Sequence, residues 1–407
     1  MKETIRKVVA QELMIICGTY TKDQPVKMMT RQIRISIKTL NHINFMNTNY
    51  NIIQLLVFCL IFSLNAQDMS FENYTPKSTL VIPGDSILRA KFPFIDVHGH
   101  QYRMPTQDLT TVVADMDKLN LQIMVNLSGR SGQDLIKSVD NITANFPKRF
   151  VVFANINFEG AGGIGWTENM VSQLIQDVEN GARGLKVYKS LGLRNKDING
   201  YRLAVDDKRL DPIWAKCGEL GIPVLIHSAD PASFWDDFDT NNERWLELKT
   251  HPRRKRSSNS PASFQQIMDE HYNIIKRHSN TTFISAHMSW LANDLGKLGL
   301  LLDEMPNMNV GIGAIIAELG RQPRFAKVFL TKYQDRVLFG KDSWKPEEFP
   351  TYFRVLESDD EYFPYHKKYH AFWAMYGLDL DDEVLKKVYY KNALRIVPGL
   401  DKSAFPE

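Results

Sequence analysis

The stretch "FPFIDVHGHQ" places two histidines, His98 and His100, one residue apart where an apolar run ends. In an extended strand, side chains two residues apart point to the same face. Two imidazoles on one face can bind a divalent metal ion together, although such a pair alone fits an ordinary loop equally well. The pair therefore directs attention to metal-ligating residue types at comparable positions elsewhere.

Three further residues of suitable type follow apolar runs: His227 in "VLIHSAD", His287 in "FISAHMS" and Asp342 in "VLFGKDSW". Imidazole nitrogens combined with one carboxylate suit Zn²⁺, Fe²⁺ or Mn²⁺. Such an ion lowers the pKa of a bound water, and a nearby carboxylate can orient that water and take its proton. A single histidine after a strand is more often a core or loop residue, but the matched positions together predict a metal site.

Other titratable residues lie near these runs. "GARGLKVYKSLG" contains Lys186 inside an apolar run and Lys189 at its end. A buried, charged and unpaired lysine costs several kcal/mol, so Lys186 is expected to be neutral, salt-bridged or modified. A structural ion pair and a place beside the metal both stay open for Lys186.

Asp96 is two residues before His98, so its side chain points to the same face of the strand as the two histidines, but it lies deeper in the strand, which favours a supporting role. His366 and His370 are expected to be surface or packing residues.

Eight short β-rich runs alternate with amphipathic helical patterns from Phe92 onward. The runs span 92–100, 121–129, 150–158, 182–190, 222–230, 281–289, 308–316 and 336–342. Most are nearly continuous in Val, Ile, Leu and Phe, as is typical of parallel strands buried on both faces. The pattern predicts an α/β fold, a (β/α)₈ TIM barrel, whose strands all end at one mouth. A doubly wound sheet would need a glycine-rich phosphate turn after its first strand, and "DVHGHQYRM" is not one.

A long insertion separates the fifth and sixth predicted strands. Loops of this length inside a compact domain are usually functional lids or disordered. The aromatic residues Phe234, Trp235 and Trp245 favour a packed lid. The basic run "RRKR", residues 253–256, is expected to be a solvated patch.

Three residues are candidates for contact with a small-molecule substrate: Trp235, Trp290 and Arg321. Trp290 follows His287 closely and could form a wall of a pocket. Arg321, in "ELGRQPRF", could hold a substrate carboxylate bidentately if it faces the mouth. An ion pair between Arg321 and Glu318 is an equal alternative.

The first 66 residues differ in character from the rest. Residues 1–45 are interpreted as a spurious segment upstream of a start at Met46. Residues 46–66 are predicted to be a signal peptide, because the apolar run "IIQLLVFCLIFSL" is followed by "NAQ". An N-terminal arm at 67–91 and the barrel with a closing helix at 92–407 follow. The protein is thus expected to be exported, either periplasmic or secreted, with a membrane anchor as the alternative; the mature chain is not expected to insert stably into a membrane.

Charge and cysteine content limit the partners of the chain. The formal net charge is +3, to which residues 1–45 contribute +5 and residues 46–66 nothing, so the remainder carries about −2. That balance does not favour a nucleic-acid partner. Of the three cysteines only Cys217 lies in the body, which excludes an internal disulfide framework. The oligomeric state stays open, a homo-oligomer included.

The spacing of His98, His100, His227, His287 and Asp342 resembles that of the metal-dependent amidohydrolase superfamily. The similarity covers about 92–398 and is closest to the amidohydrolase 2 branch, which includes aromatic-acid decarboxylases and lactonases. It implies that the first three histidines bind metal and that the aspartate binds metal and acts as the base. The remaining histidine would bind a second metal or touch the substrate.

The same resemblance bears on the number of metal ions. It favours one ion, Zn²⁺ with Mn²⁺ or Fe²⁺ as alternatives, over two ions bridged by a carboxylated Lys186. The chain departs from the usual small residue before the last-strand aspartate, since Lys341 stands there and could face the mouth or turn away.

The expected function is an exported metal-dependent hydrolase, in which metal-activated water cleaves a C–N or C–O bond of a small, carboxylated amide, lactone or ester. A metal-dependent decarboxylase using the same site is one alternative. A small-molecule binding protein without catalysis is another, and the complete set of histidines and aspartate argues against it.

Overall fold

The computed structural model describes residues 69–82, 87–257, 261–368 and 370–406. The chain divides into two compact units after Pro76, and the second unit, Lys77–Glu407, contains the barrel. The segment 1–45 and the signal peptide 46–66 lie outside the described residues, so their interpretation stays a prediction. Within the described part of the chain, every helix is too short or too polar to cross a membrane.

One sheet of eight strands, hydrogen-bonded in sequence order, forms the centre of this unit. The strands are β1 (Phe94–Gly99), β2 (Leu121–Asn126), β3 (Phe150–Asn155), β4 (Ala182–Val187), β5 (Val224–Ile226), β6 (Phe283–Ser285), β7 (Met308–Gly311) and β8 (Val337–Leu338). All successive pairs are parallel. Each strand lies within a predicted run, so the prediction of eight parallel strands is confirmed.

Two backbone hydrogen bonds join the end of the sheet to its beginning. The Val97 N–H donates to the Phe339 carbonyl (3.1 Å), and the Asp342 N–H donates to the His98 carbonyl (2.8 Å). Gly340 permits this approach, because a Cβ there would lie 2.7 Å from the Cβ of His98. The sheet therefore closes into the predicted (β/α)₈ TIM barrel, and the closure brings Asp342 beside β1.

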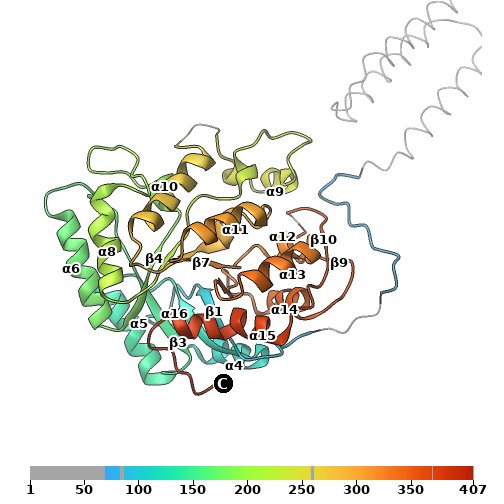
Figure 1. Ribbon diagram of the computed structural model, residues 1–407, viewed down its shortest axis with the longest axis horizontal. Helices are drawn as coiled ribbons and strands as arrows, with labels where there is room; N and C mark the ends of the chain where they lie inside the picture. Colours follow the sequence, from blue (N-terminus) through green and yellow to red (C-terminus); the bar gives the residue numbers. More distant parts are fainter. Residues whose placement is uncertain (1–68, 83–86, 258–260, 369, 407) are drawn as a thin grey trace, which may run out of the picture. The chain divides into compact units, whose positions relative to one another are not determined.

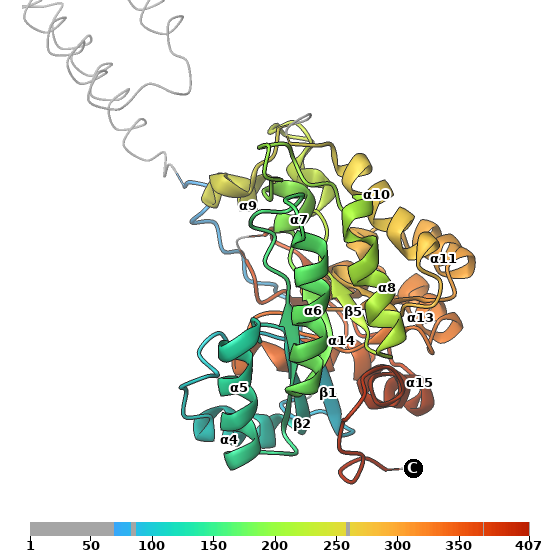
Figure 2. The same cartoon turned by 90° about the vertical axis from the view of Figure 1, so that its left-hand side faces the viewer.

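Helices follow the strands along the chain and surround the sheet (Figures 1 and 2). The longer ones are α4 (Thr110–Leu119), α5 (Gly132–Asn145), α6 (Trp166–Glu179), α8 (Asp211–Glu219), α10 (Phe264–Arg277), α11 (Leu295–Glu304), α13 (Pro323–Lys332) and α14 (Phe349–Glu357). Shorter elements are α7 (Ser190–Leu193), α9 (Trp245–Thr250), α12 (Ile316–Gly320) and the hairpin of β9 (Phe363–Pro364) with β10 (Ala374–Met375). Single 3₁₀ turns span Lys208–Leu210, Ala232–Phe234, Pro252–Arg254, Ala286–Trp290 and Pro346–Glu348.

Helix α10 illustrates why these segments are helical. Ser263 caps it by accepting a hydrogen bond from the Gln266 N–H (3.1 Å), and Ile267, Ile274 and Ile275 are buried on one side. The cap satisfies one of the unpaired N–H groups of the first turn, while the apolar stripe provides the burial that stabilises the helix in the fold.

The predicted closing helix consists of α15 (Asp382–Lys386), a π-helical turn (Lys387–Lys391) and α16 (Asn392–Ile396). It packs against both ends of the sheet: the Phe339 N–H donates to the Val388 carbonyl (2.9 Å), and the Tyr389 ring lies 5.8 Å from that of Phe94. In Figure 1 this red segment lies beside β1.

The insertion between β5 and β6 is packed, as predicted. In both views α9 lies at the opposite end of the unit from the C-terminus (Figures 1 and 2). The rings of Phe238 and Trp245 stack with centroids 5.6 Å apart. Arg254 pairs with Glu247, and Arg256 pairs with Asp230, so the expectation that residues 253–256 form a solvated patch is wrong for these two arginines. Both contribute to holding the insertion in place.

Candidate metal centre and adjoining pocket

The predicted ligand residues meet at the carboxyl ends of the strands. His98 belongs to β1 and His100 follows it directly, while His227 comes directly after β5. His287 lies in the turn after β6, and Asp342 lies in the segment after β8. Parallel strands that end at one mouth thus bring together residues far apart in the sequence.

His98, His100 and Asp342 form the centre of this cluster. The Oδ1 of Asp342 lies 3.7 Å from the Nε2 of His98 and 3.6 Å from the Nε2 of His100. One potential ligand atom of each residue lies within 4.8 Å of the others. The side chain of Asp342 is 36% exposed, whereas that of His98 is 1% exposed. The cluster is therefore open to solvent and substrate at the carboxylate.

His287 and His227 continue the cluster on one side. The ring centroid of His287 lies 5.0 Å from that of His98 and 4.2 Å from that of His227. The Nδ1 of His287 is 2.7 Å from the Gly313 carbonyl oxygen, so this nitrogen carries the proton. The Nε2 of His287 then accepts from Nδ1 of His227 at 3.2 Å. This order of protons leaves the Nε2 of His227 with a free lone pair.

Within the cluster, three buried imidazole nitrogens have no hydrogen-bond partner in the described part of the chain: Nδ1 and Nε2 of His98 and Nε2 of His227. Buried polar groups are nearly always hydrogen-bonded, and an unsatisfied one costs about 1–3 kcal/mol. Neutral imidazole nitrogens beside a carboxylate are the donor set of a divalent transition-metal site. The orphaned nitrogens therefore fit a bound metal ion.

The backbone is strained in the two turns that carry His287 and Asp342. Residues His287 to Trp290 have φ values of 55°, 49°, 56° and 55°, and Asp342 has φ 82°. Non-glycine residues in this left-handed region cost of order 1–3 kcal/mol each, and they cluster at functional sites. The strain coincides with the turns that present His287 and Asp342.

One buried carboxylate beneath the cluster holds the backbone that carries two of the candidate ligands, His98 and Asp342. Asp96, which is buried, accepts hydrogen bonds from the backbone N–H of His98 (2.8 Å) and of Lys341 (3.1 Å), so it joins β1 to the segment after β8. Gly99, between the two histidines, lies against β2: a Cβ there would lie 2.6 Å from the Cγ of Met124, so close packing explains this glycine.

A polar chain behind His100 was not predicted. The Nδ1 of His100 lies 2.8 Å from the hydroxyl of Ser128, which lies 3.0 Å from that of Tyr188. The Tyr188 hydroxyl donates to the Leu127 carbonyl (3.0 Å). Such partners orient a ligating imidazole and set its tautomer. Ser128 and Tyr188 follow β2 and β4, and no spacing in the sequence links them to His100.

Electrostatics keep the cluster in the protonation states that metal binding needs. Burial lowers the pKa of His100 and of His287 to about 4, and it lowers the pKa of His98 and His227 well below the ordinary value. Burial acts to raise the pKa of Asp342, but the neighbouring histidines and Lys186 hold it below its usual range. At neutral pH the imidazoles are therefore neutral and the carboxylate is ionised.

Two lysines near the mouth differ in their surroundings. The Nζ of Lys186 is buried, lies 5.5 Å from the Tyr188 ring centroid, and has no hydrogen-bond partner in the described part of the chain. Burial lowers the pKa of Lys186 to about 7. Lys341, although equally buried, turns away from the cluster and pairs with Glu348. The unusual residue before Asp342 therefore adds no side chain to the mouth.

The predicted substrate contacts are only partly placed at the mouth. The Trp290 ring stacks on His287 with centroids 4.3 Å apart. Trp235 instead packs within the insertion, where its Nε1–H donates to the Ala262 carbonyl (3.0 Å). Arg321 lies over the Trp373 ring (3.9 Å to the centroid) and pairs with Glu243 rather than with Glu318.

His366 and His370 are packing residues, as expected. The Nε2 of His366 lies 3.3 Å from Glu348, and that of His370 lies 3.5 Å from Glu247.

His271 is a further residue that the sequence did not single out. This buried histidine of α10 has its Nδ1 3.0 Å from the hydroxyl of Ser228 and its Nε2 2.8 Å from that of Ser285. Ser228 follows His227, and Ser285 ends β6 just before His287. His271 thus ties together the two strand ends that carry ligand candidates.

We predict that acid destabilises the metal-free protein below about pH 6.5. Burial lowers the pKa of His271 to about 3 and that of His100 and His287 to about 4. The unfolded chain takes up these protons at higher pH than the folded one, so the free energy of unfolding falls as pH falls through this window. Each histidine contributes about 1.4 kcal/mol per pH unit. Urea unfolding after chelation, compared at neutral pH and near pH 5, measures this; equal free energies would contradict it.

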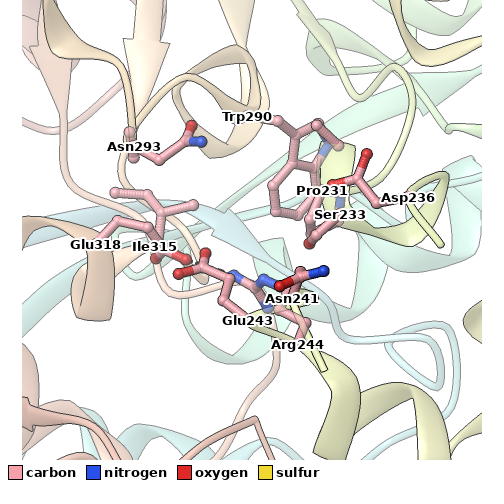
Figure 3. Close-up of a pocket in the computed structure, with 12 residues that line it drawn as sticks. Pro231, Ser233, Asp236, Asn241, Glu243, Arg244, Trp290, Asn293, Ile315 and Glu318 are labelled. Carbon is pink, nitrogen blue, oxygen red and sulfur yellow. Dashed lines mark hydrogen bonds and ion pairs between the residues drawn. The ribbon is translucent and has the colours of Figure 1, made fainter. Parts of the chain in front are cut away.

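A cavity of about 210 Å³ adjoins the cluster. It is lined by the insertion, by the turn after β6 and by the segment after β7 (Figure 3). Its lining residues are Pro231, Ala232, Ser233, Asp236, Asn241, Glu243, Arg244, Trp290, Ala292, Asn293, Ile315 and Glu318. Trp290 lines this cavity and also stacks on His287, so the cavity lies next to the histidine cluster. We call it the acidic pocket.

The fold and site define a TIM barrel with a histidine and carboxylate cluster suited to a metal ion. The profile of the family described as Amidohydrolase matches residues 95–399. The chain therefore belongs to the amidohydrolase 2 family, a metal-dependent group whose members include hydrolases and decarboxylases. A search of curated proteins finds no match.

Among solved structures, the chain is similar to a dihydroxybenzoic acid decarboxylase from Polaromonas, solved with manganese and 2-nitroresorcinol (12% identity, TM-score 0.49, 75% of this chain and 96% of that one). It is also similar to a 4-oxalomesaconate hydratase from Rhodopseudomonas palustris (14% identity, TM-score 0.43, 75% and 95%). An uncharacterised TIM-barrel protein from Bordetella bronchiseptica is a third (14% identity, TM-score 0.46, 74% and 97%). The assignment to the family rests on the profile match.

Proposed function

We propose that this protein is an exported metal-dependent hydrolase that cleaves a C–N or C–O bond in a small amide, lactone or ester. The observation that carries the proposal is the position of Asp342, a partly exposed and ionised carboxylate, beside buried neutral imidazoles with unused nitrogens. Export rests on the composition of residues 46–66 and is part of the proposal.

In this proposal His98, His100, His227 and Asp342 hold one divalent ion, Zn²⁺ in the first instance. The bound ion supplies Lewis acidity and lowers the pKa of a coordinated water. Asp342, open on its solvent side, orients the attacking water and accepts its proton. His287 keeps His227 in the tautomer whose Nε2 is free.

Two residues have narrower roles in the proposal. Lys186 is neutral for a large fraction of the time near pH 7, because burial lowers its pKa to about 7. It becomes a ligand only in the two-metal alternative, as a carboxylated side chain. Arg321 already pairs with Glu243 and stacks on Trp373, so a substrate carboxylate bound by this arginine is not included.

Decarboxylation is the second candidate. The stacked pair of His287 and Trp290 offers an aromatic surface beside the cluster, on which the ring of an aromatic acid could lie. The two candidates differ in the fate of water, because hydrolysis incorporates one oxygen atom from water and decarboxylation does not.

The test is turnover in ¹⁸O-labelled water with a panel of lactones, cyclic amides, esters and aromatic carboxylic acids. We expect a ring-opened or cleaved product that carries one ¹⁸O atom. The Asp342→Asn variant, prepared identically, controls for contaminating hydrolases. Release of CO₂ from an aromatic acid, with no labelled product from any other compound, would replace hydrolysis by decarboxylation.

A further inference from the structure

The acidic pocket has a rigid aromatic wall next to the metal centre. The Trp290 Nε1–H donates to the Ser228 carbonyl (3.1 Å), and the ring stacks on His287. In Figure 3 Trp290 lies beside Pro231 and Asp236, with Ile315 and Glu318 on the opposite side. A molecule whose reacting bond lies at the cluster would therefore extend past Trp290 into this pocket.

The charges that line the pocket are mainly negative. Asp236, Glu243 and Glu318 contribute three carboxylates, and Arg244 contributes one guanidinium. Arg244 is already neutralised, because it pairs with Glu318 and, at 2.7 Å, with Glu247. It is buried between these partners and cannot take a further anion without losing one of them.

The carboxylates nearer the rim are less fully engaged. Glu243 is 48% exposed and shares one contact of 3.1 Å with Arg321. Asp236 is exposed and has no ion-pair or side-chain hydrogen-bond partner among the described residues. An aromatic face and a free carboxylate are together the two features that attract an organic cation.

We infer that the acidic pocket binds a compact organic cation, such as a primary ammonium group at the far end of the substrate. This inference rests on the proposed function for the position of the reacting bond. The ammonium group lies between Asp236 and the face of Trp290, while a carboxylate in the same position meets uncompensated negative charge. The pocket thereby selects substrates by the charge of the part that does not react.

A binding experiment tests the pocket without requiring turnover. The purified protein is titrated at low ionic strength with pentylammonium, pentan-1-ol and pentanoate, three probes of one length that differ in terminal charge. Calorimetry or saturation-transfer NMR reports binding. Asp236→Asn removes the free carboxylate at constant size, and Asp237→Asn is the matched control, since Asp237 is an exposed neighbour that does not line the pocket.

We expect saturable binding of pentylammonium and a weaker or undetectable response to the other two probes. Asp236→Asn weakens pentylammonium binding by about fivefold, and Asp237→Asn leaves it unchanged. No pentylammonium binding, equal binding of all three probes, a preference for pentanoate, or equal effects of the two variants would overturn the inference. If pentylammonium binds as expected and no bond is hydrolysed, the proposed function fails and the cation pocket stands.

Discussion

The Asp342→Asn variant is expected to lose about 10³-fold or more of its turnover, while its metal-free form unfolds at the same temperature as the metal-free parent protein. Asparagine has the size of aspartate and tolerates the left-handed backbone found at this position, φ 82°. The fold should therefore accept the change. What is lost is the negative charge 3.7 Å and 3.6 Å from the two Nε2 atoms, and with it the group that takes a proton from water.

A matched variant separates this effect from a general loss of charge. Asp335 lies just before β8, whereas Asp342 lies after it, so the two carboxylates are at opposite ends of the strand. The side chain of Asp335 is largely exposed and pairs with Lys387 (2.8 Å). Asp335→Asn should retain full activity. Steady-state rates on any substrate found in the panel, together with thermal unfolding, provide the comparison. If Asp342→Asn keeps most of the turnover, the role assigned to this carboxylate is wrong.

The His98→Ala variant is expected to abolish turnover and metal binding with little change in the stability of the metal-free protein. Both ring nitrogens of His98 are buried without hydrogen-bond partners, and each such group costs about 1–3 kcal/mol in the folded state. Removing the ring removes the cost of its unpaired nitrogens, which stabilises the fold, but it also removes packing contacts, which destabilises it. We therefore expect the free energy of unfolding, measured in chelator, to change by less than about 1 kcal/mol.

His271 provides the contrast, because its ring is equally buried but fully hydrogen-bonded to Ser228 and Ser285. His271→Ala should destabilise the metal-free protein by about 2–4 kcal/mol, since it creates a cavity and leaves two buried hydroxyl groups unpaired. Urea unfolding of both variants in chelator gives the two values. Equal, large losses of stability would mark His98 as an ordinary core residue rather than a metal ligand.

The strands and their ends were predictable because they depend on local pattern. Nearly continuous apolar runs such as "FVVFANINF" identified parallel strands buried on both faces, and the barrel topology then placed every strand end at one mouth. His98, His100 and Asp342 meet for this reason alone. The left-handed turn from His287 to Trp290 could not be predicted, because no glycine marks it.

Contacts that depend on helix packing or on side-chain direction were not predictable in the same way. The sequence suggested either a substrate carboxylate or Glu318 as the partner of Arg321. In the structure the partner is Glu243, which belongs to the packed insertion. His271 lies in an amphipathic helix whose pattern indicates burial but not which strand ends it touches. The direction of the Lys341 side chain could not be predicted, because Lys341 lies after the end of β8, where the alternation of side chains along a strand no longer applies.

The metal content of the purified protein tests the central claim most directly. Elemental analysis should find about one equivalent of a divalent transition metal, with zinc the expected element, and the His98→Ala variant purified in parallel should contain almost none. About two equivalents, with the mass of one added CO₂, would instead indicate the two-metal site with a carboxylated Lys186. A parent protein that contains less than about a tenth of an equivalent, and takes up no Zn²⁺, Mn²⁺ or Fe²⁺ after dialysis against them, would contradict the account.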